Sequence, residues 1–190
     1  MKTSKTTIIE INKKKIGNEQ PVYIIAEIGI NHNGSLEIAK KLIDVAVVAK
    51  VDAVKFQKRD INSLYKEDVL KNPNIDSQGL EILLNVLNEV EFNNSDYEKI
   101  IQYCNDSGIT FLCTAWDKKS VDFLEKFNIP AYKIASADLT NFPLIQYICE
   151  KNKPLIVSTG MSTMEEIERT VKFLKNNNAS FILLHSQNKS

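Results

Sequence analysis

Short apolar runs alternate with longer amphipathic segments along most of the chain. Some of the short runs are uniformly apolar, and in others polar and apolar residues alternate. In the longer segments, apolar residues recur at helical spacing. This alternation predicts six parallel strands joined by helices. The predicted strands cover residues 22–28, 53–57, 110–114, 131–134, 155–158 and 181–185.

Local start and stop signals support the helices. Ser35, Ser95 and Ser162 lie where an N-cap residue is expected, and Glu165 stands three residues after Ser162, at the spacing of a capping box. Gly108 lies where a helix would end in a left-handed residue. The predicted helices cover residues 36–49, 79–90, 96–107, 118–127, 142–151 and 163–176.

Two further segments complete the predicted organisation. Residues 6–11 and 15–17 have the character of a small β-hairpin, and the polar stretch 58–78 reads as a long loop. Six consecutive βα units predict an α/β fold, either an open doubly wound sheet or a (β/α)8 TIM-type barrel. The GxGxxG fingerprint is absent, which weighs against a Rossmann domain.

Polar side chains collect at the carboxyl ends of the predicted strands. Alternation along a strand puts Lys55 and Gln57 on one face, with Val54 and Phe56 on the other, which should be apolar and pack under helices. The remaining strands end in polar residues on a shared face: Glu27, Thr114, Lys133, Ser158 and His185. This layout is the one expected of a TIM-type barrel, whose active site lies at the carboxyl ends of its strands.

The two lysines on inward faces give this pattern its most specific chemical meaning. Burial of an unpaired ammonium costs several kcal/mol, so Lys55 and Lys133 each need an anionic partner. Glu27 is a candidate for one, and a phosphorylated or carboxylated substrate for the other. The alternative is that both lysines reach solvent from an open sheet.

The segment from Ser158 to Gly160 is a candidate phosphate cradle. It ends a predicted strand just before a helix, where backbone N–H groups and the helix N-terminus favour an anion. The alternative is that this Ser-Thr-Gly segment is an ordinary turn without a ligand. His32 follows the first predicted strand and His185 ends the sixth. A divalent cation could bind at His185, because carboxylates are expected near it.

Composition excludes several functional classes. The chain has 190 residues, 24 basic and 24 acidic, so its zero net charge gives no case for nucleic-acid or anionic-membrane partners. No apolar run approaches the roughly 20 residues of a membrane span, and the N-terminus lacks a signal-peptide core. The odd number of cysteines, without CxxC spacing, predicts buried free thiols and a cytoplasmic protein. These are Cys104, Cys113 and Cys149.

Several ordered motifs together resemble the sialic acid synthase (N-acetylneuraminate synthase) family. They extend over about residues 20–185 and comprise the segments 27–34, 52–57, 130–136, 153–154 and 158–161. The family includes synthases of legionaminic and pseudaminic acids. The resemblance implies a TIM-type barrel and a metal-dependent condensation of phosphoenolpyruvate with a 2-acetamido sugar such as N-acetylmannosamine, which releases phosphate and leaves a nine-carbon keto acid.

The resemblance also implies roles for individual residues. Glu27 and Asp138 would be acid/base and sugar-orienting carboxylates, and Gln57 would contact the sugar. His185 would be the first of two histidines that bind Mn²⁺ or Mg²⁺, which would polarise the sugar aldehyde. Five residues would hold the phosphate and carboxylate of phosphoenolpyruvate: Lys55, Thr114, Lys133, Ser136 and Ser158, of which Lys133 also counts as catalytic. A homodimer is implied as well.

Three departures from the family pattern stand out. Asp138 occupies a position where many members have Glu, and Lys50-Val51 replaces a usual Gly-Ala at a helix end. Loss of that glycine is expected to cost about 1 kcal/mol. The family's His-Cys-Thr motif becomes His185-Ser186-Gln187, and a complete barrel needs about 250 residues.

These departures leave the predicted domain incomplete. We expect an N-terminal hairpin at 1–20 and a partial barrel at 21–190, without strands seven and eight, the second metal histidine and the antifreeze-like domain. The isolated chain should then self-associate and lack turnover. One alternative is a non-catalytic remnant that at most binds anions, and another is a related phosphoenolpyruvate–aldose condensing enzyme such as the deoxyoctulosonate-phosphate synthases.

Overall fold

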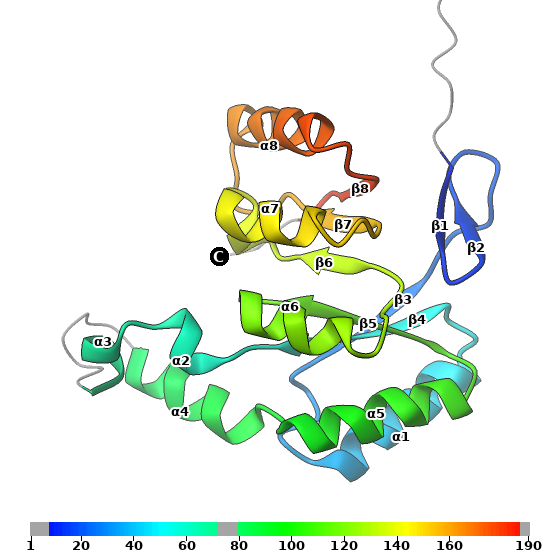
Figure 1. Ribbon diagram of the computed structural model, residues 1–190. Coiled ribbons are helices and arrows are strands. Elements are labelled where there is room, and N and C mark those ends of the chain that lie inside the picture. The colour runs from blue at the N-terminus through cyan, green and yellow to red at the C-terminus, as the bar shows by residue number, and fades with distance from the viewer. Residues whose placement is uncertain (1–7, 72–79, 187–190) are drawn as a thin grey trace, which may run out of the picture. The chain divides into compact units, whose positions relative to one another are not determined.

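The computed structural model describes residues 8–71 and 80–186, and the chain divides into two compact units (Figure 1). The central unit is Ile25–Asn128. The terminal unit joins Met1–Ile24 to Ile129–Ser190. Parallel strands alternate with helices in both units, as the sequence pattern predicts.

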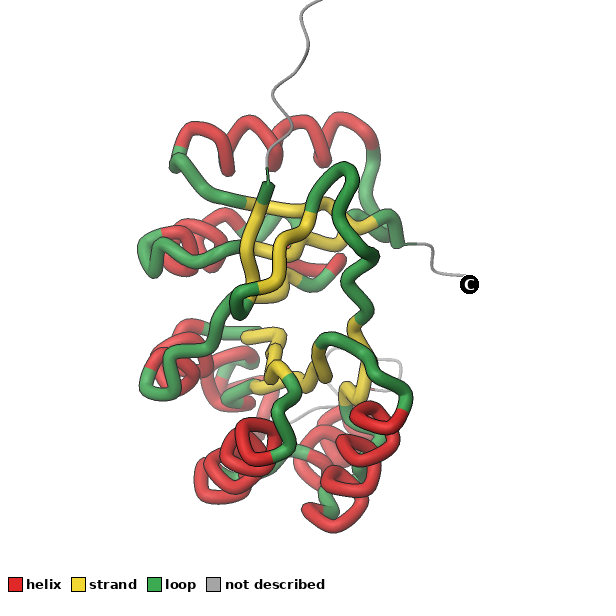
Figure 2. The backbone as a smooth tube through the Cα atoms, turned by 90° about the vertical axis from the view of Figure 1, so that its right-hand side faces the viewer, coloured by secondary structure: helices red, strands yellow, loops and turns green. Residues whose placement is uncertain are grey.

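The central unit is built on three parallel strands in the order β3-β4-β5. Its elements are β3 (Ile25–Gly29), α1 (Leu36–Val48), β4 (Ala53–Lys58), α2 (Ile61–Leu64), α3 (Glu67–Lys71), α4 (Leu80–Val90), α5 (Asn94–Asp106), β5 (Thr110–Ala115) and α6 (Lys118–Glu125). Helices α1, α5 and α6 pack against these strands (Figure 2). The register pairs Glu27 with Lys55 and Gln57 with Thr114, so polar side chains of neighbouring strands lie at the same level.

Apolar side chains at helical spacing form the core of the central unit. Helix α1 buries Ala39 and Ile43 completely, and α5 buries Ile100. Phe56 of β4 is also fully buried, and its ring stacks on that of Phe111 with the centroids 5.6 Å apart. The predicted helix-facing side of β4 therefore packs as its alternation requires.

The terminal unit contains a hairpin and three parallel strands in the order β6-β7-β8. The hairpin strands are β1 (Ile9–Ile11) and β2 (Lys14–Ile16); the other elements are β6 (Tyr132–Ile134), the 3-10 helix η2 (Ser136–Asp138), α7 (Phe142–Cys149), β7 (Leu155–Ser158), α8 (Met164–Asn176) and β8 (Phe181–Leu184). Asn12 and Lys13 make the hairpin turn with φ of 47° and 67°, the conformation that a tight two-residue β-turn needs. The predicted hairpin is confirmed, although Thr6 and Thr7 lie outside the described residues.

Two predicted N-caps are wrong by one or two residues. Ser35 caps α1 as expected and accepts a hydrogen bond from the backbone N–H of Ile38. Helix α5, however, is capped by Asn93 rather than Ser95. Helix α8 is capped by Thr163, which forms a complete capping box with Glu166. Both segments hold several adjacent capping residues, and local sequence does not decide which of them stops the helix.

The predicted loop at 58–78 is also partly wrong. Lys58 ends β4, and the short helices α2 and α3 follow it. Residues 72–78 of this prediction, together with Gly79 of the next predicted helix, lie outside the described residues. The two helices are too short for hydrophobic periodicity to reveal them.

Lys50 occupies the left-handed position at the end of α1. Its φ is +58°, its N–H bonds to the carbonyl oxygen of Val47 at 3.0 Å, and the N–H of Val51 bonds to that of Ala46 at 3.3 Å. This pattern is a Schellman motif, in which glycine is the preferred residue at the left-handed position. Gly108 takes the same place after α5, with φ of +69°, which confirms its predicted role.

We expect Lys50→Gly to raise the free energy of unfolding by about 1 kcal/mol, because glycine adopts positive φ without a Cβ penalty. Lys50 is exposed, so little packing is lost with its side chain. Urea denaturation followed by circular dichroism measures the change. Lys50→Ala is the matched control, because it removes the same side chain and keeps the backbone penalty. Equal stabilities of the two variants would contradict the assignment.

The structure also bears on the cysteines and on the absence of a predicted membrane span. Cys104, Cys113 and Cys149 are free and buried, as predicted. Burial raises the pKa of the Cys104 thiol to about 12, which leaves it unreactive at neutral pH. Within the described ranges, no helix has the length and apolar character that crossing a membrane requires.

Candidate functional site

Lys55 is the centre of a polar cluster in the central unit. Its ammonium lies 2.8 Å from a carboxylate oxygen of Glu27 and donates a hydrogen bond of 3.0 Å to the hydroxyl of Thr114. Lys55 is only 6% exposed, so the alternative in which it reaches solvent is wrong. The predicted need for an anionic partner is confirmed for Lys55, and the structure shows that Glu27, a candidate for either lysine, pairs with this one.

Parallel pairing of the strands brings these three groups together. Glu27 of β3 lies beside Lys55 of β4, and Thr114 comes from β5 on the other side. The side chain of Glu27 remains 54% exposed, whereas Lys55 and Thr114 are buried. The cluster thus presents the accessible carboxylate of Glu27, paired with the buried ammonium of Lys55, to a ligand.

The side chains of Glu27 and Gln57 both approach Gly29 closely. Its φ is +56°, and a Cβ at this position would lie 3.1 Å from the Oε1 atom of Glu27 and 3.3 Å from the Nε2 atom of Gln57. The ladder between β3 and β4 shifts register at this point. A carboxylate oxygen and an amide nitrogen therefore flank the same small space, and together they can accept from and donate to a bound ligand.

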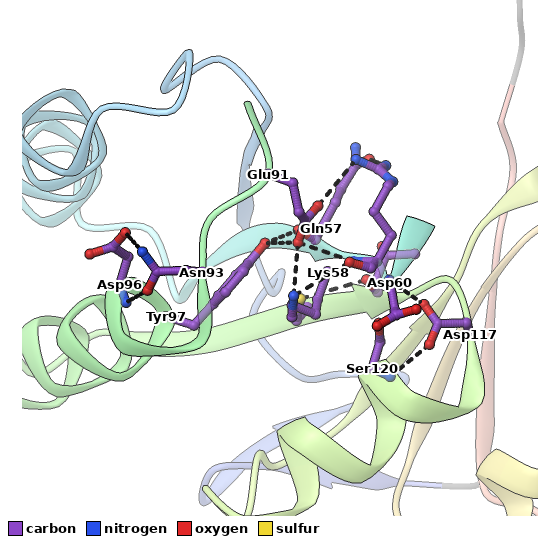
Figure 3. A network of polar contacts seen from close by, with 12 residues as sticks. Gln57, Lys58, Asp60, Glu91, Asn93, Asp96, Tyr97, Asp117 and Ser120 are labelled. Carbon is purple, nitrogen blue, oxygen red and sulfur yellow. Dashed lines mark hydrogen bonds and ion pairs between the residues drawn. The ribbon is translucent and has the colours of Figure 1, made fainter. Parts of the chain in front are cut away.

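A second polar network lies on the opposite face of β4. Lys58 donates to Oε1 of Glu91 at 3.1 Å, and its ammonium lies 4.9 Å from the ring centroid of Tyr97 (Figure 3). The hydroxyl of Tyr97 lies 3.2 Å from the same carboxylate oxygen. The expectation that this face is wholly apolar is wrong, because Lys58 is buried there at 8% exposure.

Glu91 is the shared anion of this network. Besides Lys58 it accepts a hydrogen bond of 3.3 Å from the backbone N–H of Arg59, whose guanidinium lies 3.7 Å from its second oxygen. Burial raises the pKa of Glu91, while the two cations oppose that shift. The sequence offered one signal for this network, the adjacent Lys58 and Arg59 at the end of a buried strand, but nothing that identifies Glu91 as their partner.

The rest of the network in Figure 3 has a structural role. Asp117 caps α6, accepting from the backbone N–H of Ser120 at 2.8 Å, and its second oxygen accepts from the backbone N–H of Asp60 at 2.7 Å. These bonds fix the segments that follow β4 and β5 relative to each other.

In the terminal unit, the loop after β7 lies against the residue that follows β6. The backbone N–H of Gly160 donates to the hydroxyl of Ser136 at 3.2 Å. A Cβ on Gly160 would come within 2.9 Å of that oxygen, so a larger residue would have to displace the side chain of Ser136. Ser158 is 7% exposed. Two predicted residues, Ser136 and Ser158, thus belong to elements that the structure brings together.

Lys133 and Asp138 are the ionisable groups of this region. Lys133 is 8% exposed and donates to the carbonyl oxygen of Ile134 at 2.6 Å. One carboxylate oxygen of Asp138 accepts from the side chain of Asn141 at 3.0 Å. The other is buried and has no hydrogen-bond partner among the described residues. Burial raises the pKa of Asp138, and the bond from Asn141 opposes the shift.

The two histidines differ in their surroundings. His32 is 1% exposed and stacks on Phe92, which makes it part of the core. His185 lies exposed just after β8. Across residues 8–71 and 80–186, no group of three or more His, Cys, Asp or Glu side chains could hold a metal ion. These residues alone do not form the predicted Mn²⁺ or Mg²⁺ site, so the metal stays a prediction from the resemblance.

Comparison with protein families identifies relatives of the chain. Residues 42–189 match the NeuB family. The chain is 31% identical over 170 residues to human N-acetylneuraminate-9-phosphate synthase and 35% identical over 185 residues to the N,N'-diacetyllegionaminic acid synthase of Legionella pneumophila. These alignments cover 89% and 90% of the chain but 47% and 50% of the relatives, so the chain spans about half the length of the curated relatives it matches.

A solved structure supports the same relationship. The N-acetylneuraminic acid synthetase of Leptospira borgpetersenii, crystallised with citrate, superposes with a TM-score of 0.84 at 30% identity and covers 97% of this chain and 60% of that one. The likeness confirms the predicted fold class, an incomplete (β/α)8 barrel of the α/β class.

Proposed function

Because the chain belongs to the NeuB family, we propose that it is part of a nonulosonic acid synthase that condenses phosphoenolpyruvate with a 2-acetamido sugar such as N-acetylmannosamine. The observation that carries the proposal is the cluster of Lys55, Glu27 and Thr114. A buried cation held at the carboxyl ends of parallel strands, next to an accessible carboxylate, suits an anionic substrate that reacts with a polyhydroxylated one.

In this reaction the methylene carbon of phosphoenolpyruvate forms a bond to the aldehyde carbon of the open-chain sugar, and the aldehyde oxygen takes up a proton. Water adds to C2, and cleavage of the C2–O bond releases inorganic phosphate and leaves the keto acid. Lys55 and Thr114 would bind the phosphate or carboxylate of phosphoenolpyruvate by charge-assisted and neutral hydrogen bonds. Lys133, Ser136 and Ser158 of the terminal unit are proposed for the same substrate.

The carboxylates would act on the sugar. The side chain of Glu27 is 54% exposed, and both its Oε1 atom and the Nε2 atom of Gln57 lie close to Gly29, which supports the proposal that these two residues bind neighbouring sugar oxygens. Asp138, whose pKa is raised by burial, is proposed as the second carboxylate that acts on the sugar. Metal binding by His185 and a homodimer remain predictions from the resemblance.

We expect Lys55→Met to weaken phosphoenolpyruvate binding by about 10- to 100-fold, since hydrogen bonds to charged groups contribute roughly 1.5–3 kcal/mol. Titration calorimetry with phosphoenolpyruvate measures the effect. Lys71→Met is the matched control, because Lys71 is 73% exposed and pairs only with Glu67 of its own helix turn in the described contacts. Equal affinities of the wild type and Lys55→Met would contradict the proposed site.

A turnover assay separates the synthase from the anion-binding alternative. Phosphate release from phosphoenolpyruvate in the presence of N-acetylmannosamine and Mn²⁺ would support a catalytic chain. Binding that depends on Lys55 without phosphate release would support anion binding alone.

A further inference from the structure

The amide of Gln57 has a defined orientation. Its Oε1 atom accepts a hydrogen bond from the Nη2 atom of Arg59. A guanidinium only donates, so the oxygen of the amide must face Arg59. The nitrogen must then face the opposite side, where it lies beside the Cβ position of Gly29 and opposite the Oε1 atom of Glu27.

Arg59 is itself held in place. It is 6% exposed, its guanidinium lies 3.7 Å from Glu91, and its Cζ atom is 5.1 Å from the ring centroid of Trp116. Glu91 is fixed in turn by Lys58 at 3.1 Å. A buried side chain with an ion pair on one side and an aromatic ring on another has few alternative rotamers, so it can fix its neighbour.

Donors outnumber acceptors around Arg59. The Nη1 atom of Arg59 and the Nε1 atom of Trp116 are buried and have no hydrogen-bond partner among the described residues. If the amide of Gln57 were turned round, its nitrogen would add another donor to this region and leave the guanidinium without its acceptor. The surplus of donors therefore strengthens the preference for the observed orientation.

We infer that Arg59 is a positioning residue that holds the amide nitrogen of Gln57 toward Glu27. The pair then offers one donor and one acceptor across the space left by Gly29. This combination selects a ligand with two neighbouring oxygens, one a hydroxyl that donates to Glu27 and the other an oxygen that accepts from Gln57. The identification of this ligand as the polyhydroxylated sugar rests on the proposed function, whereas the orientation of Gln57 does not.

The first test needs no ligand. In the isotopically labelled chain we expect a nuclear Overhauser effect between the side-chain amide protons of Gln57 and the Hα protons of Gly29. It should disappear or weaken severalfold in Arg59→Met, because the amide can then turn. An unchanged signal in Arg59→Met, or its absence from the wild type, would overturn the inference.

The second test addresses the ligand and a possible folding defect of Arg59→Met. Gln57→Glu preserves the acceptor for Arg59, so the ion pair with Glu91 persists, but it replaces the amide donor by an oxygen. We expect about a tenfold loss of N-acetylmannosamine affinity in Gln57→Glu and in Arg59→Met, with no further loss in the double variant. Full affinity in Gln57→Glu would overturn the donor role.

The two tests also separate this inference from the proposed function. If the wild type shows the Overhauser effect but does not bind N-acetylmannosamine, the proposed sugar substrate is wrong, while the loss of the signal in Arg59→Met still supports the positioning role of Arg59.

Discussion

We expect the chain to lose about 3 kcal/mol of stability through His32 alone as the pH falls from 6.5 to 4. His32 is 1% exposed, and its ring stacks on Phe92 with the centroids 4.0 Å apart. Its Nδ1 atom accepts a hydrogen bond from the backbone N–H of Gly34 at 3.2 Å. Burial lowers the pKa of His32 to about 4, against 6.5 for an exposed histidine.

The direction in which stability changes with pH follows from the lowered pKa of His32. The folded state holds His32 neutral, whereas the unfolded state takes up a proton below pH 6.5. The stabilising contribution is therefore complete above pH 6.5, declines as the pH falls, and is lost below about 4. Each pKa unit corresponds to about 1.4 kcal/mol, which gives the expected loss.

Urea denaturation of the wild type and of His32→Asn at several pH values measures this contribution. Asparagine keeps an acceptor for the N–H of Gly34 but does not titrate, so the difference between the two proteins isolates the histidine from the carboxylates. Parallel pH profiles would show that His32 is not held neutral. Because the chain has two histidines, His185→Asn leaves His32 as the sole imidazole signal for a direct NMR titration.

Gly34→Ala should destabilise the fold by roughly 2–4 kcal/mol. The φ of Gly34 is +71°, which costs a residue with a Cβ about 1 kcal/mol. The added Cβ would also lie 2.5 Å from the carbonyl oxygen of Glu89, a backbone atom that can move only with α4. Overpacking of this kind costs a further 1–3 kcal/mol, approximately.

Gly108→Ala is the matched control for Gly34→Ala. The φ of Gly108 is +69°, nearly the same, but nothing lies within 4 Å of a Cβ built there. We expect a loss of about 1 kcal/mol, the backbone penalty alone. Chemical denaturation of both variants gives the comparison. Equal losses would mean that the turn after β3 can move away from α4 without cost.

Hydrophobic periodicity determined most of the secondary structure because each element buries one face. The alternation along β4 is sufficient to assign Lys55 and Phe56 to opposite faces, and the need to neutralise a buried ammonium makes Glu27 a candidate partner, which the structure then pairs with Lys55. Local sequence does not fix the positions of the N-caps. The run Asn93 to Asp96 and the run Ser162 to Glu166 each contain alternatives of similar local energy, so tertiary packing decides where the helix begins.

The predicted metal site depends on groups that local sequence patterns do not identify. The assignment of His185 as a metal ligand rests on the resemblance alone, and the part of the chain that the structure describes contains no group of three His, Cys, Asp or Glu side chains that could hold a metal ion. The assignment therefore stays untested, as do the roles of Lys133 and Asp138, although both are buried or partly buried as a reactive site requires.

The sequence by itself determined the order of strands and helices, the polar ends of the strands and the need of a buried lysine for an anionic partner, because these depend on period and on charge. The tertiary structure decided that Glu27 pairs with Lys55. Only the tertiary structure decided the contact of Lys58 with Glu91, the orientation that Arg59 gives to Gln57, and the burial that lowers the pKa of His32. The physical reason is that the groups which fix these arrangements come from segments far apart along the chain. Glu91 and Phe92 are brought to β4 and to the turn after β3 by the packing of α4, and no local pattern encodes where a helix docks.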